Sequence, residues 1–158
     1  MPFADPTKVS FESSSQGWYA AAGSFSNVGR RTRRAYAGGA SLGATLQYAG
    51  GTSVTNTLAA DSVAPATAPG PGSVVTFHVY LPADARAIEW VQPFVQDTNL
   101  TYASAFAERS ALTFGAWNTL KVTLPPNALP TLHILGVEFR TSGPTPLFED
   151  IFIDAIDW

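Results

Sequence analysis

The chain of 158 residues contains no cysteine, which excludes disulfides, thiolate metal sites and a cysteine nucleophile. Charged residues make up only 13% of the sequence, about half the share found in ordinary soluble domains. Apolar runs are short, and none reaches the roughly 18 residues that a transmembrane helix needs. The net charge of −3 gives no electrostatic reason to expect nucleic acid. We therefore expect neither a membrane nor a nucleic acid as a partner.

Long amphipathic helices are also missing from the sequence. The best helical candidate, residues 102–112, is short and has no convincing cap, so we expect at most one helical turn there. Thirteen glycines and twelve prolines recur in clusters with serine and threonine, a pattern typical of turns between strands. The apolar fraction of 46% is sufficient for one buried core at this length. The sequence thus predicts one domain over residues 1–158.

Segments that alternate apolar and polar residues are frequent. The clearest are residues 74–81 and 88–96, and further strands are expected at 9–12, 42–48, 120–124, 134–140 and 151–156. Tandem short strands separated by Gly, Pro and Asp turns predict an all-β sandwich or barrel. The stretch 59–72 has the composition of a linker, but the pieces on either side are too short to fold alone, so we interpret it as an internal loop.

Segment 88–96 has one apolar side and one side that alternates aromatic rings with amides. The second side carries Trp90, Gln92, Phe94 and Gln96. Aromatic rings stack on the apolar faces of sugars, and neutral polar groups bind sugar hydroxyls without a large desolvation cost. This side is therefore a candidate sugar-binding surface. The alternative is that Trp90 and Phe94 are core residues of a strand buried on both sides.

Other segments supply candidates for the same surface. We expect neighbouring strands to add polar and aromatic side chains to it, and loops to close its rim. The candidates are His78, Tyr80, Asn99, Tyr102, Trp117, Lys121, Glu138 and Arg140. For Trp117, packing at the start of a strand is the alternative.

Several short signatures follow one another along nearly the whole chain. They are Phe11-Glu12, then GGASL at 38–42, VQPFVQD at 91–97, WNTL at 117–120 and IDAIDW at 153–158. In this order the chain resembles the β-jelly-roll carbohydrate-binding modules that are appended to bacterial plant-polysaccharide hydrolases. The resemblance implies two antiparallel sheets packed face to face, with a ligand groove on the concave sheet or at loops on one edge. It also implies a secreted, extracellular module tethered to a glycoside hydrolase domain. The first residues lack a signal peptide, so we expect a mature fragment, and we expect a monomer.

The resemblance further implies one structural Ca²⁺ ion. Its ligands would be Glu12, backbone carbonyl oxygens near residues 38–42, and Asp154. The composition agrees with a cation bound by oxygen atoms, because the chain has no cysteine and only two histidines. The alternative for both carboxylates is that they are solvated turn residues.

The sequence therefore predicts a non-catalytic module that binds a β-linked plant cell-wall polysaccharide such as mannan, xylan or β-glucan. Catalysis lacks support, because His78 and His133 carry no linked catalytic motif and no convincing pair of facing carboxylates occurs. A second hypothesis is a binder of acidic polysaccharides such as pectin or alginate, using the arginine cluster of residues 30–34. Those arginines could instead form a solvated loop or a charged hairpin edge. A third hypothesis is a structural or adhesion sandwich without a sugar ligand.

Overall fold

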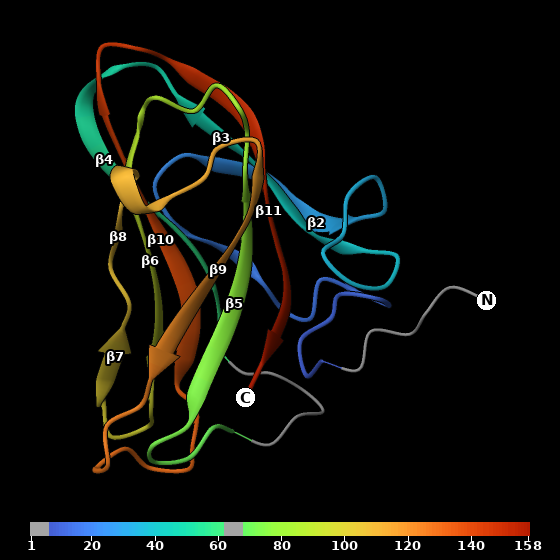
Figure 1. Ribbon diagram of the computed structural model, residues 1–158, viewed down its shortest axis with the longest axis vertical. Helices are drawn as coiled ribbons and strands as arrows, with labels where there is room; N and C mark the ends of the chain where they lie inside the picture. Colours follow the sequence, from blue (N-terminus) through green and yellow to red (C-terminus); the bar gives the residue numbers. More distant parts are fainter. Residues whose placement is uncertain (1–6, 62–67) are drawn as a thin grey trace.

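In this computed structural model, which describes residues 7–61 and 68–158, two antiparallel sheets pack face to face (Figure 1). The first sheet has the order β1 (Tyr19–Ala22), β4 (Gly51–Ala60), β10 (Ile134–Gly143), β6 (Ile88–Gln96) and β7 (Tyr102–Ser104), and β8 (Ala107–Glu108) also pairs with β6. The second has the order β2 (Phe25–Arg31), β3 (Ser41–Tyr48), β11 (Leu147–Asp157), β5 (Val74–Leu81) and β9 (Ala116–Thr123). Within the described residues the only helix is a 3₁₀ turn, η1 (Arg109–Ala111).

The connections between the strands define a jelly roll. The chain changes sheet at every connection except those between β2 and β3, between β6 and β7, and between β7 and β8. The resulting orders, β4-β10-β6-β7 and β3-β11-β5-β9, are those of two interleaved Greek keys. The predicted all-β, jelly-roll sandwich is therefore confirmed.

The core lies between the two sheets and is filled by the inward residues of each strand. On β5 these are Val75, Phe77, Val79 and Leu81, all fully buried, and each contributes about 1.5–3 kcal/mol through removal of apolar surface from water. Among the described residues, no helix is long and apolar enough to span a membrane.

The strand bounds agree with the sequence predictions best where the alternation is cleanest. Residues 74–81 and 88–96 form β5 and β6 as predicted. The predicted strand over 9–12 is wrong, because Val9 makes only an isolated bridge with Ile156 and Phe11 turns into the left-handed region at φ 58°. Residues 102–112 form β7, β8 and the turn η1. Residues 59 and 60 of the expected 59–72 loop belong to β4, and positions 62–67 lie outside the described residues.

Candidate functional site

The outer face of the first sheet gathers seven of the predicted ligand residues. Register places Arg140 beside Trp90, Glu138 beside Gln92, and Tyr102 beside Gln96. Val91 and Val95 of β6 point the other way, into the core. We call this surface the aromatic–amide face, and it consists of Trp90, Gln92, Phe94, Gln96, Tyr102, Glu138 and Arg140.

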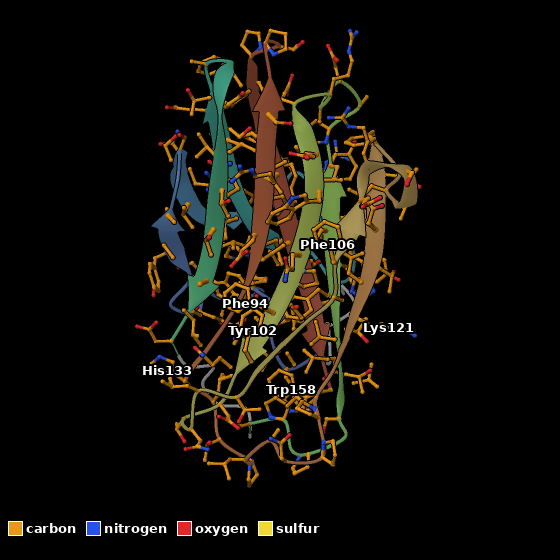
Figure 2. The ribbon with its side chains drawn as sticks, turned by 90° about the vertical axis from the view of Figure 1, so that its left-hand side faces the viewer. Phe94, Tyr102, Phe106, Lys121, His133 and Trp158 are labelled. Carbon is orange, nitrogen blue, oxygen red and sulfur yellow. The ribbon has the colours of Figure 1, made fainter. Side chains whose placement is uncertain are left out.

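Two pairs of rings stand on this face. The rings of Phe94 and Tyr102 are stacked, with centroids 5.7 Å apart and an interplanar angle of 20°. Trp90 and Phe106 are 5.3 Å apart and tilted by 50°. Phe94 and Tyr102 lie side by side on the sheet face turned to the viewer in Figure 2, and Phe106 lies further along it. Because Trp90 and Phe94 are four residues apart on one strand, their backbone positions are separated by about 13 Å.

Gly136 allows the Phe94 ring to lie over the neighbouring strand. Gly136 pairs with Phe94 on one side and with Ala59 on the other. A Cβ atom at position 136 would lie 2.9 Å from Cζ of Phe94, 2.9 Å from Cβ of Ala59 and 2.4 Å from the carbonyl oxygen of Leu58. The missing side chain therefore leaves space for the Phe94 ring, which is buried with only 5% of its surface exposed.

Polar groups lie between the two ring pairs. Nε2 of Gln92 is 3.5 Å from the Tyr102 hydroxyl, and Nη1 of Arg140 donates to Oγ1 of Thr55 at 3.0 Å. Burial raises the pKa of Glu138. Burial, and then the charge of Glu138, raise the pKa of Tyr102. The face thus presents a phenol, two amides, a guanidinium and the carboxyl group of Glu138, which together can donate to and accept from hydroxyl groups.

A hollow continues the face at its Trp90 end. It has a volume of about 800 Å³ and is lined by Glu89, Trp90, Phe106, Glu108, Arg109, Ser110 and Ser142. Phe106 is 54% exposed, and our sequence reasoning did not select it as a ligand residue. In the sequence, Phe106 is a large apolar residue in a segment without regular alternation, and this pattern indicates a ligand residue only weakly.

The turn after β6 is fixed by Asp97. Its Oδ1 accepts hydrogen bonds from the backbone N–H groups of Asn99 and Thr101, and its Oδ2 accepts one from Leu129, each at 2.8 Å. The Leu129 bond above all, aided by those from Thr101 and Asn99, lowers the pKa of Asp97 despite its burial. The turn leaves Asn99 exposed beyond the end of the strand, next to the Gln96 end of the face.

The expectation that His78 and Tyr80 share a surface with Trp90 is wrong. They lie on β5, which belongs to the second sheet between β11 and β9, so their outward side chains are on the opposite side of the sandwich. Trp117 and Lys121 lie on β9 of the same second sheet, where Trp117 pairs with Tyr80. Figure 2 shows Lys121 at the margin, away from Phe94 and Tyr102. Consecutive strands of a jelly roll often alternate between sheets, and residue periodicity does not reveal which ones do.

Most of the arginines at 30–34 are bound within the protein. Nε of Arg30 donates to the carbonyl oxygens of Phe11 and Glu12, at 3.1 and 2.9 Å. Arg31 donates to two backbone carbonyls, and Arg33 pairs with Asp150. Arg30 and Arg31 end β2, an edge strand, which agrees with the charged-edge interpretation.

Glu12 and Asp154 converge on one backbone segment, residues 36–40. Glu12 accepts hydrogen bonds from the N–H groups of Gly39 and Ala40, and Asp154 accepts them from Tyr36 and Ala37. Carboxylate oxygens are ligands that Ca²⁺ prefers, but all four oxygens here accept backbone N–H groups, so a bound ion would replace some of these hydrogen bonds. The remaining ligands would have to be backbone carbonyls, because among residues 7–61 and 68–158 no group of three or more His, Cys, Asp or Glu residues is placed to hold a metal.

Comparison with known proteins relates this fold to carbohydrate-binding modules. No protein-family model matches the chain, and no curated protein matches it. One similar solved structure comes from work on the promiscuous specificity of carbohydrate-binding modules from the β-sandwich superfamily. Its TM-score is 0.82 at 24% identity, over 98% of this chain and 62% of that one. The chain therefore spans about three fifths of that structure.

Two further structures match this chain over most of their own length. A non-crystalline-cellulose-specific module, CBM28, matches with a TM-score of 0.61 at 15% identity, over 99% of this chain and 95% of that one. A xylan-binding domain from CBM22 matches with a TM-score of 0.56 at 16% identity, over 94% and 89%. The chain thus has the β-sandwich fold of carbohydrate-binding modules, as the sequence signatures predicted.

Proposed function

We propose that this protein is a non-catalytic carbohydrate-binding module that holds a neutral, β-linked polysaccharide on the aromatic–amide face. The observation that carries the proposal is the pair of ring groups, Phe94–Tyr102 and Trp90–Phe106, on either side of a polar centre. Tyr102 and Phe106, at 46% and 54% exposure, are open to a sugar, whereas Phe94 is 5% exposed and packs against Tyr102. Exposed rings stack on the apolar faces of sugar units, and the polar groups between them bind hydroxyls. The similar solved structures named for xylan and cellulose binding support the same class of ligand.

The charge of the surface favours a neutral ligand over an acidic one. Glu138 lies in the centre of the face, and Glu89 and Glu108 line the hollow beside Trp90. These three carboxyl groups outnumber Arg140 and Arg109, the two arginines of the same face and hollow, so no excess of positive charge attracts a uronic-acid chain. The arginine cluster at 30–34 has few free donors for a polyanion, because Arg30, Arg31 and Arg33 already bind carbonyl or carboxylate oxygens.

Binding without catalysis agrees with the chemistry of the face. A glycosidase needs two carboxylates on either side of the scissile bond, one of them a proton donor. On the aromatic–amide face Glu138 is the single carboxylate, and Gln92 lies beside it in register. In a secreted hydrolase the module would raise the concentration of its tethered catalytic domain at the polysaccharide. We also propose that the isolated chain is a monomer.

We further propose a structural Ca²⁺ ion at Glu12 and Asp154. The support is the resemblance and the convergence of both carboxylates on residues 36–40. When bound, the cation would supply charge neutralisation and a fixed attachment for this segment. Asp154 lies on β11 of the second sheet, so we expect the ion to stabilise the fold and not to contact a ligand on the first.

A glycan panel in affinity gels tests the proposed function. The panel contains xylan, glucomannan, mixed-linkage β-glucan, pectin and alginate, each run at low and high salt. We expect retardation by at least one neutral polysaccharide, with the same strength at both salt concentrations, because stacking and hydroxyl contacts are little screened. Retardation by pectin or alginate alone, lost at high salt, would contradict the neutral-ligand proposal. No retardation by any polymer, together with elution larger than a monomer, would favour the adhesion hypothesis instead.

A further inference from the structure

The second sheet carries a separate hollow on the opposite side of the sandwich. It has a volume of about 330 Å³ and is lined by Arg33, Arg34, Tyr80, Pro82, Ala83, Asp84, Glu149, Asp150 and Phe152. We call it the arginine hollow. It shares no lining residue with the aromatic–amide face or with the larger hollow beside Trp90.

Arg34 is held in this hollow by its stacking contacts. Its guanidinium lies over the Tyr80 ring at 3.7 Å from the centroid, and 5.5 Å from that of Phe152. Tyr80 is itself braced edge-to-face by Trp117 and Phe152, at 5.7 and 6.0 Å. The backbone of Arg34 is fixed as well, because the Ser41 hydroxyl donates to its carbonyl oxygen at 2.6 Å.

The donors of Arg34 are available to a ligand. Within the described residues, its guanidinium N–H groups have no hydrogen-bond or ion-pair partner, whereas Arg33 pairs with Asp150 and Arg86 with Asp84. A guanidinium that lies over an aromatic ring can still donate its N–H groups in a fork, and such a fork matches two adjacent oxygen atoms. Because its position is already set, little side-chain freedom would be lost on binding.

The charges around the hollow select the kind of ligand. Two arginines and three carboxylate residues line it, and the ion pairs above neutralise Arg33, Asp150 and Asp84. No excess of positive charge is left to attract a polyanion. The volume is at the lower end of the range for ligand pockets, so it suits one or two sugar units and not an extended chain.

We propose that the arginine hollow is a second sugar site, which binds a neutral mono- or disaccharide unit through the forked donors of Arg34. The donors would hold vicinal hydroxyls, with the Asp84 and Asp150 carboxylates as acceptors at the wall. This site goes beyond the proposed function and does not depend on the aromatic–amide face. Its natural ligand would be a chain end or a short branch of a polysaccharide.

The test uses the indole N–H signals of Trp90 and Trp117 as reporters of the two faces, assigned with Trp90→Phe and Trp117→Phe variants. The ¹⁵N-labelled chain is titrated with xylobiose, cellobiose and mannobiose, and with the corresponding hexasaccharides. We expect at least one disaccharide to shift the Trp117 signal saturably. Arg34→Ala should weaken that titration about tenfold without changing the titration at Trp90.

Three control experiments separate the outcomes. Arg34→Lys keeps the charge but loses the fork, so it should also weaken binding at Trp117, and it guards against loss of folding in Arg34→Ala. Lys121→Ala removes a cation of the same sheet outside the hollow and should change nothing. Digalacturonate should bind less well than the neutral disaccharides.

The results can contradict the second sugar site and the proposed function of the aromatic–amide face independently. No shift of Trp117 with any disaccharide overturns the second site, whatever the hexasaccharides do at Trp90. A shift of Trp117 that is unchanged in both Arg34 variants also overturns it. A shift at Trp117 with none at Trp90 supports the second site and contradicts the first.

Discussion

Replacing Gly136 by alanine tests whether the ring geometry of the face is built as described. The new Cβ would lie 2.4 Å from the Leu58 carbonyl oxygen, which belongs to the paired strand β4 and cannot swing away. It would also lie 2.9 Å from Cζ of Phe94. Overpacking of this kind costs about 1–3 kcal/mol of unfolding free energy. At this chain length each kcal/mol lowers the melting temperature by roughly 2–4 °C.

The assay is thermal unfolding followed by a glycan titration. We expect Gly136→Ala to melt several degrees lower and, because Phe94 must move off Tyr102, to bind the selected polysaccharide more weakly. Gly70→Ala is the matched control, since its Cβ would meet nothing closer than 4.0 Å and its φ is not positive. A variant at 136 that melts like the wild type and binds equally well would refute the account of how Phe94 is seated.

Three further predictions concern the carboxyl groups of Glu138 and Asp97 and the proposed calcium ion. Burial raises the pKa of Glu138, so its contribution to stability is present below the unfolded value of about 4.3 and is lost as pH rises through the folded value. Glu138→Gln should therefore gain melting temperature relative to wild type between about pH 4 and pH 7, and a constant difference would contradict the burial argument. Backbone hydrogen bonds lower the pKa of Asp97, so its contribution is lost as pH falls through that lowered value. Asp97→Asn should melt lower at pH 7, with the deficit shrinking on acidification, and an unchanged melting curve would argue against the role of Asp97 in the turn. EDTA should lower the melting temperature and Ca²⁺ restore it without loss of glycan binding, since a metal bound to the folded chain stabilises it by mass action. An identical melt in EDTA would remove the calcium proposal.

The strands that could be predicted are those whose side chains alternate cleanly. Residues 74–81 are mostly β-branched or aromatic, residues 88–96 alternate an apolar side with an aromatic and amide side, and the bounds of both agree with β5 and β6. β1, β2 and β4 were missed because their sequences, YAAA, FSNVGRR and GTSVTNTLAA, are dominated by small and polar residues. These three strands are held by pairing with their neighbours more than by propensity of their own.

The candidate site could be predicted strand by strand but not as a whole. Side chains two residues apart on a strand point to the same side, so the sequence predicts that Trp90, Gln92, Phe94 and Gln96 share a face. The structure places them on one outward face. Which strands flank β6 depends on long-range topology. The partners turned out to be β10, β7 and β8, so Glu138, Arg140 and Tyr102 join the face while His78 and Tyr80 lie on the other sheet.

The most direct test of the central claim is a binding isotherm of Trp90→Ala with a soluble form of the neutral glycan that the gels select. Trp90 is half-buried beside Phe106 on the outer face, so its removal should leave the fold intact. We expect affinity to fall by about fivefold or more, equivalent to roughly 1 kcal/mol of lost stacking. Phe148→Ala is the matched control, because this ring is 63% exposed on β11 of the second sheet and lines neither hollow. An unchanged isotherm for Trp90→Ala, or an equal loss in Phe148→Ala, would contradict the assignment of glycan binding to the aromatic–amide face.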